Sequence, residues 1–491
     1  MSENHNRYRA INPKILLFGL LIALTPPVKA QQAIDVPHDY PFIRYNANHL
    51  HYDTSSASMR HFFHKWNLVV DAMQGNVNIV HIGSSHVQGG SFPNRVRYNF
   101  MSELPDLVAD RGMLFPYSAA AKCNNPPDYA VHCPERVELT RCVYAQPAYD
   151  LGLCGIAITA HDTPTHIDIA IRPTHIDYAT RRVIVLGYSP DEIIPLLGIN
   201  GREIPPSYID TATRRYIFNL SETTDSVQVI LPCSAGTSFT LTGVYLGNRQ
   251  SGFSYHSIGV NGASLADYAK CIHFADDLRL LNPDLVIFGI GINDASGPNF
   301  DTTVFFNRYM VLIEKIRALN PSCAFIFITN NDSFRATGRK RRRRYTVNNN
   351  GPLARDVAYR LAKATGGAVW DQFEIMGGLK SMEKWCKAGL AQRDHVHFTP
   401  TGYTLLGDLL YNAIIEAYQN TPKERLEDKA GVKDDKSNKE ISTNRNNESS
   451  AKNNKSNGVT QARNNEKTTK TNKTKQQTDN PNNGIPACIS Y

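Results

Sequence analysis

The stretch VNIVHIGSSH, residues 77–86, joins an apolar run to a turn of small residues. The run predicts a strand over Val77–Ile82, and apolar residues on both of its faces are typical of a parallel sheet. Reactive groups gather beyond the carboxyl ends of such strands. The turn Gly83-Ser84-Ser85 is therefore a candidate site, where a serine hydroxyl and its backbone N–H point into a crevice. A purely structural turn is the competing interpretation, because glycine–serine turns are common.

Beyond residue 250 the pattern alternates between strand and helix. Apolar runs predict strands over residues 285–289, 324–329 and 368–370, and helical spacing of apolar residues predicts a helix over 353–364. Strands that alternate with helices form a parallel sheet with helices on both faces. The fold class predicted here is therefore α/β, with three layers (α/β/α) and a flavodoxin-like parallel sheet.

Residues 104–250 have a different pattern. Isoleucines occupy alternate positions over 167–171, as in a half-buried strand, and Asn200-Gly201 between apolar runs is typical of a hairpin turn. Further short strands are expected at 182–186, 216–220, 227–231 and 239–246. Strands without intervening helices predict an antiparallel β-sandwich, inserted into an α/β domain made of residues 31–103 and 251–420.

The two ends of the chain are expected to lie outside these domains. Residues 1–30 have the pattern of a signal peptide, with basic residues ahead of the short apolar run Ile15–Leu24 and small residues before a cleavage site after Ala30. An uncleaved anchor is the alternative. The signal predicts export to the periplasm or cell surface, with no integral membrane segment after cleavage. The Asn/Lys-rich tail, residues 421–491, is expected to be disordered because it has little apolar surface to bury.

Charge and cysteine content add weaker constraints. The chain has 491 residues and a formal net charge of +8, which suits a polyanionic surface such as a cell envelope. Binding to nucleic acid is disfavoured by export. Nine cysteines are present, and in an exported protein one or two disulfides are plausible within one group of four. That group comprises Cys123, Cys133, Cys142 and Cys154.

A second candidate site lies just ahead of the last predicted helix. Thr399 is a good N-cap and Pro400 suits the first helical turn, so Asp394 and His397 lie on the preceding loop. At a spacing of three residues, the carboxylate can accept a hydrogen bond from one imidazole nitrogen. The other nitrogen remains available to take a proton from a serine hydroxyl.

Two more short motifs offer hydrogen-bond donors. Gly291-Ile292-Asn293-Asp294 follows the strand predicted at 285–289, and the Asn293 amide can donate to a developing oxyanion. Gly262 lies in the segment Gly259–Ala263, and without a side chain its N–H can approach a substrate oxygen closely. These donors would complement a serine nucleophile.

Together the four motifs resemble, in their order and rough spacing, the blocks of the SGNH/GDSL hydrolase family. The resemblance implies Ser85 as nucleophile, His397 as base and Asp394 as the residue that orients it. It also implies an oxyanion hole formed by the N–H groups of Ser85 and Gly262 and by the Asn293 side chain. One departure is Ser84, which stands where the family usually has Asp, so reduced activity, a specialised subgroup, or Ser84 itself as nucleophile are alternatives.

Other polar residues have competing interpretations. His395 and His397 are spaced like two metal ligands, but no acidic or cysteine partner accompanies them, and His81 and His86 are expected to pack or hydrogen-bond. We predict no metal and no cofactor. The basic run at residues 339–344 could bind an anionic glycan or be a solvated loop, and residues 331–333 could line the cleft.

The resemblance, with its inserted β-domain, is to bacterial peptidoglycan and carbohydrate O-acetylesterases. It implies an exported serine esterase that hydrolyses O-acyl esters, O-acetyl above all, on a cell-envelope or other glycan. The substrate partner is then an acylated glycan such as peptidoglycan. Alternatives are an esterase for lipid or plant polysaccharide, an O-acyltransferase with the same triad, and a weakly active or non-catalytic glycan-binding protein.

Overall fold

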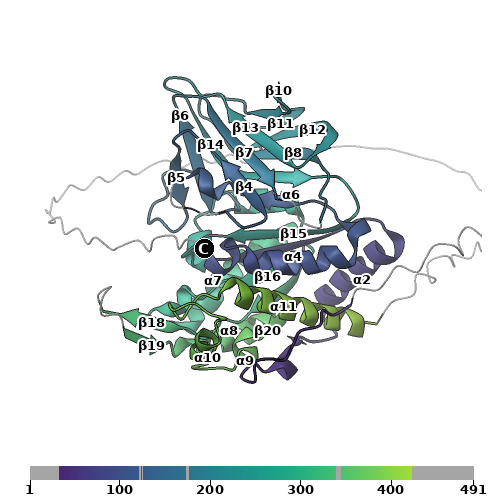
Figure 1. Ribbon diagram of the computed structural model, residues 1–491, viewed down its shortest axis with the longest axis vertical. Coiled ribbons are helices and arrows are strands. Elements are labelled where there is room, and N and C mark those ends of the chain that lie inside the picture. Colours follow the sequence, from purple (N-terminus) through teal and green to yellow (C-terminus); the bar gives the residue numbers. More distant parts are fainter. Residues whose placement is uncertain (1–31, 121–122, 124, 173–175, 339–343, 423–491) are drawn as a thin grey trace, which may run out of the picture. The chain divides into compact units, whose positions relative to one another are not determined.

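A computed structural model describes residues 32–120, 123, 125–172, 176–338 and 344–422 (Figure 1). The predicted signal peptide, all but the first two residues of the predicted tail, and most of the basic run at 339–344 lie outside the described residues. In the described part of the chain, no helix is long and apolar enough to cross a membrane.

A six-stranded sheet forms the centre of the α/β region. Its strand order is β1-β20-β17-β16-β2-β15, and every neighbouring pair is parallel except the edge pair β1–β20. The strands span Leu50–His51 (β1), Asn76–Gly83 (β2), Gly252–Gly259 (β15), Leu285–Gly289 (β16), Ala324–Ile328 (β17) and Ala368–Trp370 (β20). The predicted α/β class and parallel sheet are confirmed.

Helices cover both faces of this sheet. Leu285 and Ile287 of β16 pack into one apolar cluster, and Val286 and Phe288 of the same strand pack into another. The first cluster holds residues of α2 (Ala57–Ala72), α4 (Ser91–Glu103) and α11 (Pro400–Asn420). The second holds residues of α5 (Leu265–Tyr268), α6 (Phe274–Leu281), α7 (Thr302–Leu319) and α8 (Asn350–Thr365). Alternate side chains of β16 thus pack against two helical layers, because successive side chains of a strand point to opposite faces of the sheet.

Residues 112–247 form two antiparallel sheets, as their alternating pattern predicts. The seven-stranded sheet runs β11-β12-β8-β14-β6-β5 with β3 paired to β14, and the five-stranded sheet runs β10-β9-β13-β7-β4. Their strands are Gly112–Leu114 (β3), Tyr129–His132 (β4), Glu138–Arg141 (β5), Ile156–His161 (β6), Thr165–Ile171 (β7), Thr180–Tyr188 (β8), Leu196–Ile199 (β9), Arg202–Ile204 (β10), Tyr208–Asp210 (β11), Arg215–Thr224 (β12), Ser226–Leu231 (β13) and Ser238–Gly247 (β14). The hairpin predicted at Asn200-Gly201 is present, with φ of 51° and 74° at its two central residues.

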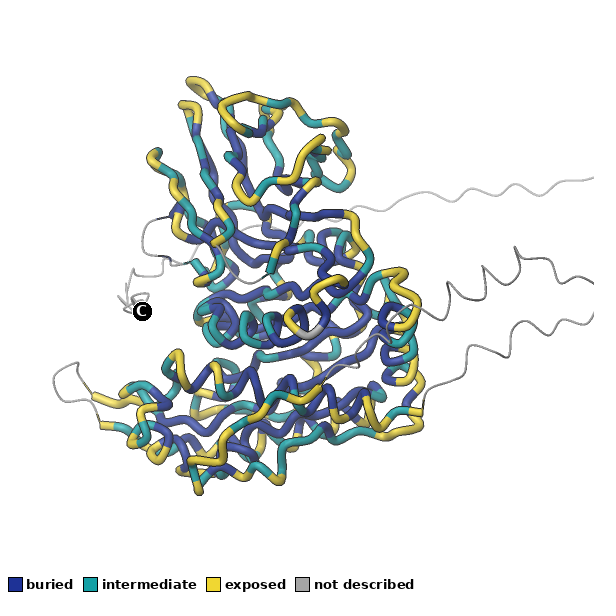
Figure 2. The backbone as a smooth tube through the Cα atoms, turned by 45° about the vertical axis from the view of Figure 1, so that its right-hand side comes forward, coloured by how far each residue is buried: buried dark blue, intermediate teal, exposed yellow. Residues whose placement is uncertain are grey.

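The antiparallel sheets share a core with one helical layer of the α/β region. Ile169 of β7 and Val185 of β8 belong to the same apolar cluster as Leu312 of α7. In Figure 2, residues coloured as buried occur in both regions. The two regions therefore pack on a common apolar core. The domain boundaries at 103/104 and 250/251 stay predictions.

Short elements complete the described chain. They are the helices α3 (Ser85–Gln88), α9 (Gln372–Ile375) and α10 (Met382–Lys387), the strands β18 (Phe334–Thr337) and β19 (Arg344–Val347), and the 3₁₀ turns Tyr45–Ala47, Pro105–Leu107, Tyr117–Ala119 and Asp294–Ser296. The hairpin β18–β19 was not predicted. It flanks the basic run.

The expected disulfides within the group of four cysteines are absent. Cys133, Cys142 and Cys154 are free thiols in the structure, so no bridge can join members of this group. Proximity in sequence is misleading here, because Cys133 follows β4 of one sheet and Cys142 follows β5 of the other. The Cys142 thiol instead hydrogen-bonds with the Cys271 thiol, beyond the insertion.

Candidate active site

Three neighbouring parallel strands end at the same level of the sheet. Gly83 of β2 is paired with Gly259 of β15 on one side and with Gly289 of β16 on the other. The segments that follow these glycines carry Ser85, Gly262 and Asn293, respectively. The register of the sheet therefore brings three of the four sequence motifs to one edge, where α/β proteins place their reactive groups.

The fourth motif meets the first through direct hydrogen bonds. Ser85 Oγ lies 2.8 Å from His397 Nε2, and His397 Nδ1 lies 2.7 Å from Asp394 Oδ2. Because a carboxylate only accepts, the imidazole proton lies on Nδ1, and Nε2 is left to accept from the serine hydroxyl. The structure thus brings together all three residues of the expected triad.

The Asp394 carboxylate is fixed by its own loop. Its Oδ1 accepts the backbone N–H groups of Val396 at 2.9 Å and His397 at 3.0 Å. Burial alone would raise the pKa of Asp394, but the hydrogen bonds and the charge of His397 outweigh it and lower that pKa to about 2. Asp394 is therefore ionised at neutral and mildly acidic pH.

The helix that follows this loop begins as predicted. Thr399 is the N-cap of α11, its hydroxyl accepts the N–H of Gly402 at 3.2 Å, and Pro400 is the first helical residue. Asn331, one of the residues expected to line the cleft, lies beyond the end of β17 and has a supporting role that the sequence did not predict. Its amide donates to the Val396 carbonyl at 3.0 Å and so holds the loop between the two triad residues. Its place just past a buried strand was the only signal for it.

The two serines of the nucleophile turn differ in environment. Ser84 is fully buried, and its hydroxyl has no hydrogen-bond partner among the described residues. Ser85 begins the short helix α3 and is only partly buried. Of the two hydroxyls, the one that reaches His397 belongs to Ser85.

The expected oxyanion donors also lie close to one another. Asn293 Nδ2 donates to the carbonyl of Ala263 at 2.9 Å, so it is adjacent to the segment that contains Gly262. Gly262 has a φ of +81°, which favours glycine, and a Cβ placed on it would meet nothing within 4 Å. The Gly262 backbone thus faces open space beside the Asn293 amide.

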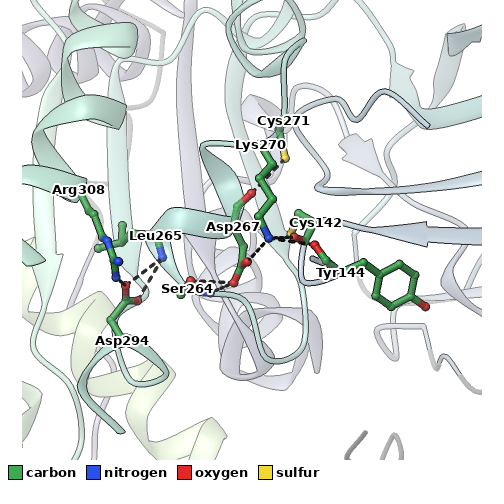
Figure 3. Close-up of polar contacts among 9 residues, drawn as sticks. All are labelled: Cys142, Tyr144, Ser264, Leu265, Asp267, Lys270, Cys271, Asp294 and Arg308. Carbon is green, nitrogen blue, oxygen red and sulfur yellow. Dashed lines mark hydrogen bonds and ion pairs between the residues drawn. The ribbon is translucent and has the colours of Figure 1, made fainter. Parts of the chain in front are cut away.

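Asp294 connects the Asn293 turn to the helix that follows Gly262. Its carboxylate accepts the N–H of Leu265, at the start of α5, at 3.1 Å, and pairs with Arg308 at 3.4 Å (Figure 3). Burial raises the pKa of Asp294 to about 6, against the lowering effect of Leu265 and Arg308. A buried carboxylate at the N-terminus of α5 therefore fixes the distance between the two oxyanion segments.

His86 borders the triad without taking part in it. Its Nδ1 lies 2.7 Å from the hydroxyl of Tyr403, and its ring centroid lies 5.2 Å from that of His397. Burial lowers the pKa of His86 to about 3, so this imidazole is neutral beside the triad. It lines a pocket together with Ile292, Phe398 and Tyr403.

The other histidines singled out in the sequence do not converge on a common point. His81 is buried, and its Nδ1 lies 2.8 Å from the hydroxyl of Tyr255. The His395 ring packs against Tyr345 with centroids 4.7 Å apart, whereas His397 is engaged in the triad. In the described ranges, no group of three or more His, Cys, Asp or Glu residues could hold a metal ion.

Comparison with known proteins gives one family match. Residues 242–405 match the model of the "GDSL-like Lipase/Acylhydrolase family". The expected resemblance to GDSL hydrolases is confirmed. The matched segment contains four of the five predicted site residues, which are Gly262, Asn293, Asp394 and His397. The family match supports a hydrolase that acts on esters. No protein sequence of the curated collection matches the chain.

One solved structure extends the comparison beyond the segment that the family model matches. A structure described as "Peptidoglycan O-acetylesterase in action, 5 min" aligns with a TM-score of 0.61 and 19% identity, covering 75% of this chain and 99% of that one. A lipase/acylhydrolase from Enterococcus faecalis aligns with a TM-score of 0.25 and 24% identity, over 33% of this chain and 76% of that one. A GDSL-like lipase from Bacteroides thetaiotaomicron has a TM-score of 0.25 and 19% identity, over 34% and 76%. The first likeness shows the fold of the α/β and β-rich regions together.

Proposed function

We propose that this chain is an exported serine esterase that hydrolyses O-acetyl esters on a glycan of the cell envelope. The observation that carries the proposal is the hydrogen-bonded series Ser85–His397–Asp394, with distances of 2.8 and 2.7 Å. A serine hydroxyl is a weak nucleophile, and a base oriented by a carboxylate is the arrangement that activates it.

The proposed reaction begins with attack of Ser85 Oγ on the ester carbonyl. His397 Nε2 takes the hydroxyl proton, and the ionised Asp394 stabilises the imidazolium that forms. The imidazolium then returns the proton to the departing sugar oxygen, which leaves an acetyl group on Ser85. A water molecule, activated by the same nitrogen, hydrolyses this acyl-enzyme. Each step uses side chains of this chain.

Negative charge on the carbonyl oxygen would be stabilised by the Ser85 and Gly262 N–H groups and by the Asn293 amide. The Asn293 amide nitrogen carries two N–H groups, and one of them donates to the Ala263 carbonyl. The second N–H is thus available for the oxyanion. Preorganised donors of this kind are often the largest single contribution to the rate of acyl transfer.

Support for a glycan ester comes from two independent features. The fold, including the inserted antiparallel sheets, is similar to that of a protein described as a peptidoglycan O-acetylesterase. The chain also carries a net charge of +8, which suits an anionic envelope polymer. The predicted signal peptide agrees with action outside the cytoplasm.

The test compares the mature protein with Ser85→Ala and with Ser84→Ala as a matched control. Acetate release is measured from a chromogenic acetyl ester, from O-acetylated peptidoglycan and from acetylated xylan. Ser85→Ala should abolish release, whereas Ser84→Ala should keep most of it, because the buried Ser84 hydroxyl has no partner to lose among the described residues.

Each result decides between specific alternatives. A folded parent that releases no acetate would overturn the hydrolase, and equal release by the parent and Ser85→Ala would overturn the nucleophile. Acetate from xylan but not from peptidoglycan would replace the substrate. Transfer of acetyl groups to a glycan acceptor in place of water would identify an acyltransferase.

A further inference from the structure

The peptide group between Asn261 and Gly262 is held by a residue from the antiparallel region. Arg141 Nη2 donates a hydrogen bond to the Asn261 carbonyl at 2.5 Å. The N–H of the same peptide group is that of Gly262, the expected oxyanion donor. Because a peptide group is planar and normally trans, its carbonyl and N–H point in opposite directions. Whatever fixes the direction of the Asn261 carbonyl therefore fixes the direction of the Gly262 N–H.

This peptide group needs external support because glycine follows it. Gly262 has a φ of +81° and open space around it, so the backbone can rotate there with little steric resistance. On the other side of Asn261, its own N–H donates to Gln88 Oε1 at 2.6 Å. Gln88 belongs to α3, the helix that Ser85 begins. The segment is thus tied to the nucleophile helix at one peptide group and to Arg141 at the next.

Arg141 is itself fixed against the α/β region. It is the last residue of β5, and the carbonyls of Cys142 and Tyr144 just after it both accept from Lys270 Nζ at 2.9 Å (Figure 3). Lys270 follows α5 and also pairs with Asp267 of that helix at 2.8 Å. The turn after β5 is therefore anchored beside α5, and the Arg141 guanidinium reaches the Asn261 carbonyl from a defined position.

The positive charge has a second effect on the peptide group. A cation at the carbonyl oxygen draws electron density toward that oxygen, which makes the N–H at the other end a stronger donor.

We propose that Arg141 is a positioning residue of the oxyanion hole, which orients and polarises the Asn261–Gly262 peptide so that the Gly262 N–H faces the reacting carbonyl oxygen. The inserted region then contributes to the chemical step. This inference rests on the proposed esterase function.

The experiment measures kcat and KM of the full mature protein on a chromogenic acetyl ester. Arg141→Met removes the charge and the hydrogen bond but keeps an apolar stem, and Arg141→Lys keeps the charge. Glu138→Gln is the matched control, since it removes a charge from the same strand, and the Glu138 carboxylate contacts Tyr149 and His161. We expect Arg141→Met to lower kcat about tenfold to a hundredfold, less than the loss of a donor itself, with KM almost unchanged. Arg141→Lys should recover part of that loss, and Glu138→Gln should keep most of the parent kcat.

Three results would overturn the inference. They are a parent-like kcat for Arg141→Met, equal losses of kcat in Arg141→Met and Glu138→Gln, or a loss confined to KM. If Arg141→Met does not fold, Arg141→Gln, which removes the charge and shortens the side chain, is judged by the same split between kcat and KM, and a parent-like kcat would again contradict the inference. An inactive parent would overturn both proposals, whereas an active parent with an unaffected Arg141→Met would overturn only this one.

Discussion

The triad side of the site (Ser85, Asp394 and His397) and its oxyanion side (Gly262 and Asn293) are assembled in different ways. On the triad side the functional residues bind one another directly, at 2.8 and 2.7 Å. On the oxyanion side no described hydrogen bond joins Gly262 to Asn293. Their segments are positioned by other residues, chiefly Arg141 and Asp294. Proton transfer from Ser85 to an oriented His397 needs an unbroken series of hydrogen bonds, whereas oxyanion donors must point at a substrate atom and so depend on the backbone that carries them.

The difference predicts where mutations act. Substitutions on the triad side should remove the reaction almost completely because they interrupt a single series of bonds. Substitutions on the oxyanion side should weaken it in steps because several donors share the charge. The predictions below test this contrast, starting from the largest expected effect.

Asp394→Asn should lower kcat by about 10⁴-fold, because an amide no longer holds the imidazole proton on Nδ1 or balances the imidazolium. The Asn oxygen can still accept the N–H groups of Val396 and His397, so the loop should fold normally. Steady-state kinetics at the pH optimum measure the loss, and circular dichroism checks the fold. A loss of kcat of less than tenfold would contradict the proposed difference, because substitutions on the triad side would then lower kcat no more than those on the oxyanion side.

Asn293→Ala should lower kcat by about 10²–10³-fold with a small change in KM, since the lost donor acts mainly on the transition state. The same kinetic measurement applies. Ser296→Ala is a matched control in the same turn, because the exposed Ser296 hydroxyl donates only to the Asn293 carbonyl. A loss as large as that of Asp394→Asn, or an equal loss in Ser296→Ala, would contradict the expected role of the amide.

The same contrast explains what the sequence could predict. Asp394 and His397 are three residues apart, and the strands that precede Ser85 and Asn293 are mostly apolar, so local patterns predicted the Asp–His pair and four strands of the central sheet. The role of Ser85 was implied by the family resemblance. Gln88 and Arg141 lie 173 and 120 residues from Asn261, and no local pattern links them to it. Contacts of this kind depend on how the antiparallel sheets pack, which spacing along the chain does not encode.

The smallest expected effect concerns Asp294, whose burial raises its pKa to about 6 in the folded protein. An unfolded Asp has a pKa near 3.9, so between roughly pH 4 and 6 the folded state binds the proton more tightly. The stability of the parent should therefore increase as pH falls from above 6 toward 4. Asp294→Asn keeps an acceptor for the Leu265 N–H but has no charge. The Tm of this variant should therefore exceed that of the parent by roughly a few degrees at pH 8, and by less at pH 4.5.

Arg308→Gln removes the cation that lowers the pKa of Asp294, so the Tm of this variant should depend more strongly on pH than that of the parent. The ion pair itself adds little to stability, because Arg308 is well exposed. Thermal unfolding at both pH values measures the effect, and a constant difference between parent and Asp294→Asn would show that the buried charge does not limit the stability of the oxyanion side.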